Sequence, residues 1–439
     1  MKKLLLSITL FNIVLFANAQ AIRWGNKTSS PGTDIEQTHG IAADSVGNTY
    51  IIGSYIDTLH LGSILLTAKS HSQDIFVAKV DSLGHYVWAK SFGGTGTDEG
   101  FGITVDNSGN IFCTGGFNGH MFFTPNDSLV SLGGSDMWVA KLDNNGNLLM
   151  KLSDGNTSND YGRSVAVNYS NGNFAVVGDE TNNVYYYVKK YNSLGNVLFT
   201  KLFAATTVTG TGVSFDNNDL LYTCGYYTGN LSTVPATGMS NHGSTDGVVL
   251  VFSSSGNTFS YEQAYGGAND DYCYGIKSEP NGSAFYVCGS FRAANYVIGY
   301  SGSDQVVLPG SSSINYPFVQ KVQVTAANTV WANQYNGFTS FNSIATDKYG
   351  NVFCGSPYLG TFKYMSYGQF AWLSNPGGSL QATDLVNGLA TDKKGNAYCA
   401  GQFIGTKTFG DSVLAGGGGL YHSAFIEKIS SARLTVPSP

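Results

Sequence analysis

The sequence predicts an all-β protein, folded as a seven-bladed β-propeller with four strands in each blade. Three observations predict this fold: a composition rich in strand and turn residues, a hairpin motif that returns seven times, and a second strand pair between the hairpins. The chain has 439 residues, with 56 Gly, 27 Tyr and 26 Phe, and 12% of its residues are charged. Such a composition favours many short strands joined by tight turns.

The first element, residues 1–19, has the pattern of a Sec-type secretory signal peptide. Two lysines form its positive end, an apolar run follows, and Ala17-Asn18-Ala19 provides a small-residue cleavage site. Removal of this segment would leave a mature protein that begins near Gln20. The rest of the sequence holds no apolar stretch long enough to cross a membrane. We therefore expect a secreted or cell-surface protein.

The repeated hairpin is clearest at residues 102–116, where two short apolar runs flank the turn D-N-S-G-N. Asp106 opens the turn and Gly109 closes it, which is the composition that tight β-turns favour. The turn aspartates could be read as calcium ligands, but an Asx turn explains them better. The seven copies lie near residues 40–54, 102–116, 162–178, 212–226, 275–290, 343–356 and 388–402.

A second strand pair follows most of the hairpins. Residues 74–80 read DIFVAKV and residues 86–94 read YVWAKSFGG, and residues 136–142 repeat the first of these as DMWVAKL. Each repeat therefore supplies about four strands, and a four-stranded unit repeated radially is a propeller blade. The rival arrangements are an open solenoid and two small sandwiches.

The two ends of the chain favour a closed ring. Residues 423–429 supply the third strand of the last repeat, but no fourth strand follows. Residues 21–27, AIRWGNK, resemble the missing W-A-K strand. We predict that this N-terminal strand pairs into the last blade and closes the ring, because a solenoid would need atypical capping repeats. The propeller would then span residues 20–430, with a tail at 431–439.

In combination, three motifs resemble the SBBP family, the seven-bladed β-propeller repeats of secreted bacterial proteins. These motifs are G-I-x-x-D-x-x-G-N-x-Y/F-x-x-G, F/W-V-A-K-L/V-D-x-x-G and W-A-K-x-F-G-G. The resemblance covers essentially the whole mature chain. It implies an extracellular or surface location in a bacterium and a binding or scaffold role, with no catalytic residues shared across the family.

The loops that lead into the inner strands carry the candidate ligand-binding residues. In a propeller these loops surround one mouth of the central channel, where carboxylates favour a cationic ligand or a metal ion such as calcium. The alternative is that each aspartate caps its own turn. The candidates are Asp34, Asp98, Glu99, Phe101, Asp160, Tyr161, Asp270, Asp271, Tyr272 and Asp384.

The six cysteines and seven histidines show no spacing typical of a zinc site. Cys273 and Cys288 lie on the two strands of one hairpin, equally far from its turn, so we predict a disulfide between them. His39 is the one histidine next to an inner-strand glycine, at the expected channel mouth.

The most direct interpretation is a monomeric, non-enzymatic binding or scaffold module that holds a protein or glycan ligand on one face of the ring. The net charge of −6 and the scattered lysines argue against a nucleic-acid partner. One alternative is an extracellular lyase or hydrolase, which would need His, Glu or Arg from several blades to converge at the channel mouth. Another is a carbohydrate-binding lectin with aromatic pockets.

Overall fold

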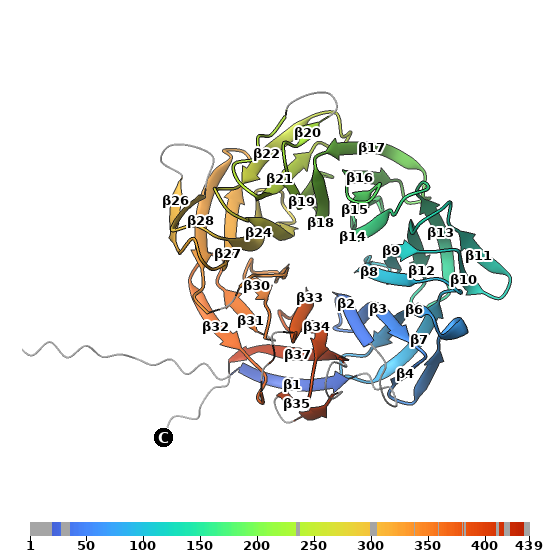
Figure 1. Cartoon of the computed structure of the whole chain (residues 1–439). Helices are drawn as coiled ribbons and strands as arrows, with labels where there is room; N and C mark the ends of the chain where they lie inside the picture. The colour runs from blue at the N-terminus through green and yellow to red at the C-terminus, as the bar shows by residue number, and fades with distance from the viewer. Residues whose placement is uncertain are drawn as a thin grey trace, which may run out of the picture.

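Seven antiparallel sheets, six of four strands and one of five, surround a central axis in the computed structural model (Figure 1), which confirms the predicted all-β, seven-bladed fold. The structure describes residues 20–27, 36–233, 238–298, 305–337, 339–358, 360–379, 381, 383–409, 412–416 and 422–433. The predicted signal peptide at 1–19 and the candidate Asp34 lie outside these residues. Within them, no helix has the length and apolar character needed to span a bilayer.

Each blade runs from an inner strand at the axis to an outer strand at the circumference. Blade 1 contains β2 (Glu36–Ala43), β3 (Thr49–Ile56), β6 (Gln73–Val80) and β7 (Tyr86–Phe92); blade 2 contains β8 (Asp98–Val105), β9 (Ile111–Phe117), β12 (Asp136–Leu142) and β13 (Leu148–Asp154); blade 3 contains β14 (Tyr161–Val167), β15 (Phe174–Glu180), β16 (Tyr185–Tyr191) and β17 (Val197–Ala204). Blade 4 contains β18 (Thr207–Phe215), β19 (Leu221–Thr228), β21 (Thr245–Phe252) and β22 (Phe259–Tyr265); blade 5 contains β23 (Tyr272–Ser278), β24 (Ala284–Phe291), β27 (Tyr316–Gln323) and β28 (Asn328–Gln334). Blade 6 contains β29 (Ser343–Thr346), β30 (Val352–Gly355), β31 (Thr361–Tyr364) and β32 (Phe370–Ser374); blade 7 contains β33 (Leu385–Thr391), β34 (Ala397–Phe403), β37 (Ser423–Arg433) and β1 (Gln20–Lys27).

Blade 7 draws on both ends of the chain. The N-terminal strand β1 pairs antiparallel with β37, with Asn26 opposite Ile426 and Lys27 opposite Phe425. Figure 1 shows the first strand in blue lying beside the last strand in red. That the ring depends on β1 for its closure stays a prediction.

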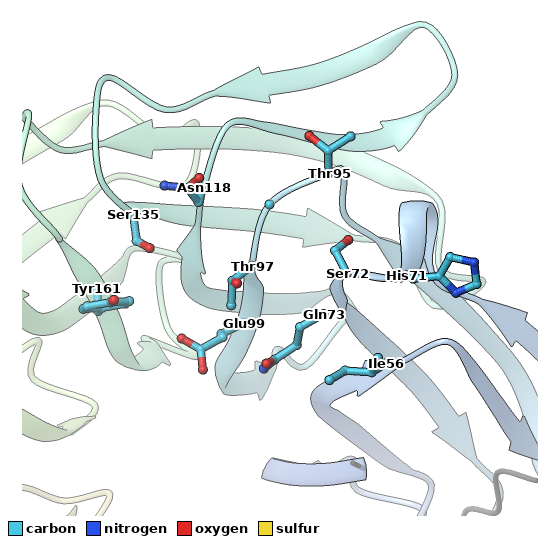
Figure 2. A pocket seen from close by; sticks show the side chains of 11 residues that line it. Ile56, His71, Ser72, Gln73, Thr95, Thr97, Glu99, Asn118, Ser135 and Tyr161 are labelled. Atoms are coloured by element: carbon cyan, nitrogen blue, oxygen red, sulfur yellow. The ribbon is translucent and has the colours of Figure 1, made fainter. Parts of the chain in front are cut away.

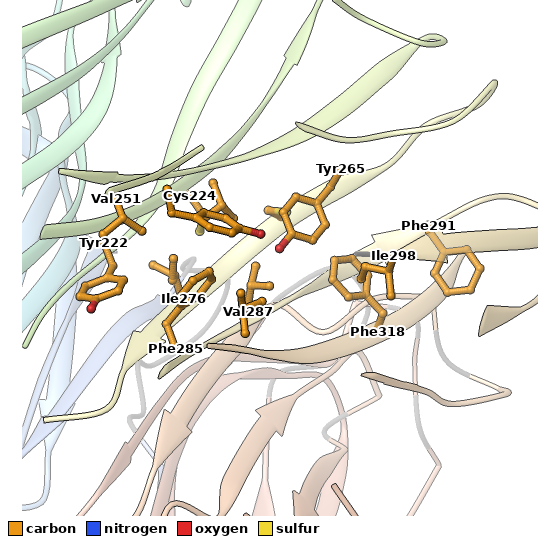
Figure 3. Packing of buried hydrophobic residues seen from close by; sticks show 14 of the residues in the cluster. Tyr222, Cys224, Val251, Tyr265, Ile276, Phe285, Val287, Phe291, Ile298 and Phe318 are labelled. Carbon is orange, nitrogen blue, oxygen red and sulfur yellow. The ribbon is translucent and has the colours of Figure 1, made fainter. Parts of the chain in front are cut away.

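The hydrophobic core lies between the blades. Each of the seven junctions has its own cluster of buried residues, to which both neighbouring blades contribute. At the junction of blades 4 and 5, Tyr222 and Val251 pack against Ile276 and Phe285 (Figure 3). Because each blade buries its apolar faces against its two neighbours, a single blade has no core of its own.

Additional short strands that the repeat pattern did not predict lie between the second and third strands of several blades. They are the hairpins β4 (Thr58–Leu61) to β5 (Ile64–Thr67), β10 (His120–Thr124) to β11 (Asp127–Val130), β25 (Asn295–Ile298) to β26 (Val306–Pro309) and β35 (Thr406–Phe409) to β36 (Ser412–Ala415), with the short strand β20 (Ser232–Thr233) in blade 4. Three of these insertions pair with the preceding blade: β20 pairs with β17, Phe122 bridges to Gly93, and Thr408 bridges to Gly377. The insertions therefore join neighbouring blades. A one-turn 3-10 helix, η1 (Lys69–His71), precedes β6.

The hairpin turns confirm the Asx-turn prediction. Oδ1 of Asp106 accepts the backbone N–H groups of Ser108 and Asn110, both at 2.8 Å, and Oδ2 accepts the Asn110 amide at 2.7 Å. The same arrangement recurs at Asp44 and Asp347. These carboxylates organise the turn backbone on the face opposite the loops that lead into the inner strands.

Candidate functional site

The rim is the face of the ring formed by the loops that connect the outer strand of one blade to the inner strand of the next. Just inside it, a β-bulge interrupts the inner strand of six blades. The unpaired bulge residues are half-buried on the strands closest to the axis, and they are His39, Phe101, Arg163, Thr211, Tyr274 and Asn387. A bulge redirects a side chain at the end of a strand. Of these six residues the sequence singled out only His39 and Phe101, although five of the six directly precede an inner-strand glycine.

The aspartates of the predicted acidic rim accept hydrogen bonds from backbone N–H groups, which explains why they recur there. Asp98 is fully buried, and its two oxygens accept the N–H of Gly94 at 2.8 Å and of Asn118 at 3.3 Å. It thus ties the loop that leads into blade 2 to the loop that follows β9. Asp160, Asp271 and Asp384 are also buried and repeat this pair of bonds in blades 3, 5 and 7. Each of these four candidates therefore serves as a link between two loops.

Three of these linking aspartates have a second buried aspartate as a neighbour. It lies on the third strand of the preceding blade. Asp74, Asp136 and Asp246 are each at most 2% exposed. Burial raises the pKa of Asp74 to about 6 and, together with the negative charge of Asp74, the pKa of Asp98 to about 7. Burial likewise raises the pKa of Asp271 to about 7. The junctions thus hold carboxyl groups that take up protons near neutral pH.

The remaining candidates separate into two places. Asp270 forms an ion pair with Arg292 at 3.0 Å, and Tyr272 stacks on Tyr274 with ring centroids 5.4 Å apart. Glu99 and Tyr161 instead line an open cleft on the rim. In the described part of the chain, no three His, Cys, Asp or Glu side chains come close enough together to hold a metal ion.

The cleft spans the rim from blade 1 to blade 3 and has a volume of about 650 Å3 (Figure 2). Blade 1 contributes Ile56 and the segment 71–73, blade 2 contributes the segment 95–97, Glu99, Asn118 and Ser135, and blade 3 contributes Tyr161. Burial raises the pKa of Glu99, although the nearby guanidinium of Arg163 and a hydrogen bond with Gln73 oppose the increase.

Aromatic and charged side chains from three blades meet beside the cleft. The guanidinium of Arg163 lies 4.8 Å from the ring centre of Phe101 and 4.5 Å from that of Tyr161. It is held by the buried Asp179 through two hydrogen bonds of 2.7 and 3.2 Å. The ring of His39 packs edge-on against Phe101, and burial together with the charge of Arg163 lowers the pKa of His39 to about 4. His39 is therefore neutral at physiological pH.

The predicted disulfide is not formed, because Cys273 and Cys288 are both buried free thiols. The bulge at Tyr274 shifts the register, so that Cys273 faces Gly289 and Cys288 faces Gly275. The prediction assumed a regular ladder, in which the two cysteines would face each other.

Comparison with known proteins agrees with the fold. Residues 87–116, which cover β7 to most of β9, match the family model described as the SBBP β-propeller repeat. No curated protein matches the sequence. Among 705 similar chains of solved structures is Kuenenia stuttgartiensis hydrazine synthase, with a TM-score of 0.53 and 9% identity over 88% of this chain and 97% of that one. At this identity the likeness extends to the fold alone. The chain is a seven-bladed β-propeller that carries an SBBP β-propeller repeat.

Proposed function

We propose that the chain is a secreted or cell-surface binding module that holds its ligand on the rim, without catalysing a reaction. The propeller fold is suited to such a role, because loops from several blades present side chains on one face. The observation that carries the proposal is the cleft across blades 1 to 3. It gathers residues from three repeats into a hollow of the size typical of ligand sites.

The charged groups beside the cleft favour binding over catalysis. A general acid or base must be free to reach the reacting atoms. Asp98 and Asp160 are instead bound to backbone amides, and Arg163 is bound to Asp179. Secretion is supported by the signal-peptide pattern at residues 1–19 and by the family resemblance.

Two Thr→Trp substitutions test the proposal. Thr97 is exposed and lines the cleft, so Thr97→Trp would fill it, whereas Thr383 is exposed at the same repeat position before blade 7 and does not line the cleft. Purified chain from residue 20 would be screened against arrays of glycans and peptides. We expect bound ligands to be lost with Thr97→Trp and retained with Thr383→Trp. Ligands that bind both variants equally would contradict a site on this part of the rim. Cell fractionation would test secretion.

A second candidate function is acid–base catalysis at the channel mouth. His39, Glu99 and Arg163 come from three different blades and meet beside the cleft, which is the convergence that an enzyme would need. Against this, Nε2 of His39 is buried with no partner among the described residues, and a pKa of about 4 makes the imidazole a weak base. Turnover of polysaccharides by the native chain, abolished by His39→Ala, would establish this function instead.

A further inference from the structure

The side chains of the cleft have a distinctive chemistry. Among the described residues that line it, most are neutral and polar, Glu99 is the one carboxylate, and Ile56 is the one aliphatic side chain. In the part of the chain that the structure describes, the side-chain polar groups of five lining residues form no hydrogen bond with protein. They are Thr95, Thr97, Asn118, Ser135 and Tyr161.

These five side chains come from blades 2 and 3 and face the same hollow, as Figure 2 shows for Asn118, Ser135 and Tyr161 at one end and Thr97 at its centre. Hydroxyl groups both donate and accept hydrogen bonds, and an amide side chain offers one group of each kind. A ligand that satisfies them must therefore carry many groups that also donate and accept.

We infer that the cleft binds a neutral oligosaccharide, with Glu99 accepting hydrogen bonds from two neighbouring sugar hydroxyls. The inference rests on the proposed function and names the ligand class for the same site. Sugar hydroxyls donate and accept within a short distance of one another, which matches the free groups of the cleft. A carboxylate forms stronger hydrogen bonds with hydroxyls than a neutral acceptor does.

Other ligand classes fit the cleft less well. Among the described lining residues, an anionic ligand would meet the Glu99 carboxylate and no Lys or Arg, and the one imidazole, that of His71, is paired with Asp57. A peptide held by its side chains would need apolar pockets, but Ile56 is isolated. The guanidinium of Arg163 covers one face of the Tyr161 ring and Gly116 packs against the ring edge, so we expect the tyrosine to contribute chiefly its hydroxyl.

Isothermal titration of the chain from residue 20 with maltotriose, cellotriose and mannotriose tests the inference. We expect at least one to bind, with weak affinity because the cleft is open to solvent. Glu99→Gln keeps the shape and removes the charge, so it should weaken binding about tenfold, the ratio expected for a hydrogen bond to a charged group. Thr97→Trp should weaken binding further, and Thr383→Trp should leave it unchanged.

Two results would overturn the inference, and they differ in what they leave standing. If only peptides or acidic oligosaccharides bind, and Thr97→Trp abolishes that binding, the ligand class is wrong and the proposed function remains. If no ligand of any class is affected by Thr97→Trp, both the inference and the proposed function fail.

Discussion

Two consecutive glycines, such as Gly266 and Gly267, follow the outer strand of a blade, and the two have different roles. A Cβ atom at Gly266 would lie 2.1–2.3 Å from the carboxyl group of the buried Asp246, whereas one at Gly267 would have only Asp271 Oδ2 within contact, at 3.5 Å. Gly93 and Gly155 are packed in the same way against Asp74 and Asp136. The first glycine of the W-A-K-x-F-G-G motif thus makes room for a buried carboxylate.

We expect Gly266→Ala to destabilise the protein by about 1–3 kcal/mol, the usual cost of inserting a methyl group into a packed site. Gly267→Ala is the matched control, because its methyl group would make an ordinary contact. Chemical denaturation of both variants measures the difference. Equal stability of the two would show that the loop shifts without cost.

Glu427 is a buried carboxyl group in the third strand of blade 7, only 3% exposed, and burial raises its pKa to about 8. In the unfolded chain a glutamate ionises near pH 4.3. The folded state therefore binds an extra proton between about pH 4 and pH 8, and this group makes the protein less stable as the pH rises through that window.

Glu427→Gln should therefore raise the free energy of unfolding at pH 8, by a few kcal/mol, and leave it nearly unchanged at pH 4. Glutamine has almost the same shape and cannot ionise, so the variant removes the titration alone. Thermal unfolding at both pH values provides the measurement. A stabilisation of equal size at both pH values would rule out ionisation as its cause.

At the scale of strands and turns, the sequence correctly predicted the features that depend on residues close together in the chain. The D-x-x-G-N turns, as at Asp106, and the four strands of each repeat follow from short-range preferences, and they are confirmed. The bulge at Tyr274 was not predicted, because the break in the alternation of buried residues falls at Gly275, which has no side chain to mark it, and the disulfide prediction failed for that reason.

The candidate site was only partly predictable. The sequence identified Glu99 and Tyr161, which do line the cleft, but it could not distinguish them from the neighbouring Asp98 and Asp160, which are buried. Whether a rim residue faces solvent or the backbone depends on the bulge and on contacts with another blade. The neutral side chains of the cleft, such as Ser135, gave no signal because serine is common in loops.

In blades 1 and 5, a tryptophan on the outer strand forms a hydrogen bond with the next blade. Nε1 of Trp88 donates to the carbonyl of Asn144 at 3.0 Å, from blade 1 to blade 2, and Nε1 of Trp331 donates to the carbonyl of Ser366 at 3.1 Å, from blade 5 to blade 6. The lysine of the V-A-K strand adds a parallel contact: Lys190 reaches the carbonyl of Ser254 in blade 4 at 2.9 Å.

Trp331→Phe should lower the free energy of unfolding by about 0.5–1.5 kcal/mol through loss of this hydrogen bond, beyond the loss of ring area. Trp372→Phe is the control, since in the described part of blade 6 the indole nitrogen of Trp372 has no hydrogen-bond partner. Urea unfolding of the two variants compares them. Equal losses of stability in the two variants would show that packing, and not the hydrogen bond of Trp331, accounts for the whole effect.

For the whole molecule, several contacts hold blade 7 to blade 1. Lys428 Nζ donates to the carbonyl of Ser82 at 3.0 Å, and Asn387 Nδ2 donates to the carbonyl of Thr38 at 2.9 Å. A shared hydrophobic cluster lies at the same junction. These contacts involve residues more than 340 positions apart, so closing the ring carries a large loss of chain entropy that the junction must offset.

The outer strand β1 should contribute much of the stability of this junction. A chain lacking residues 21–27 would leave an unpaired edge on β37 and expose the insertion of blade 7, because Gly25 packs on Phe409. We expect a clearly lower melting temperature, and partial recovery when a synthetic peptide of residues 20–27 is added to pair with the free edge. A scrambled peptide of the same composition is the control. An unchanged melting temperature would show that the junction contacts close the ring without this strand.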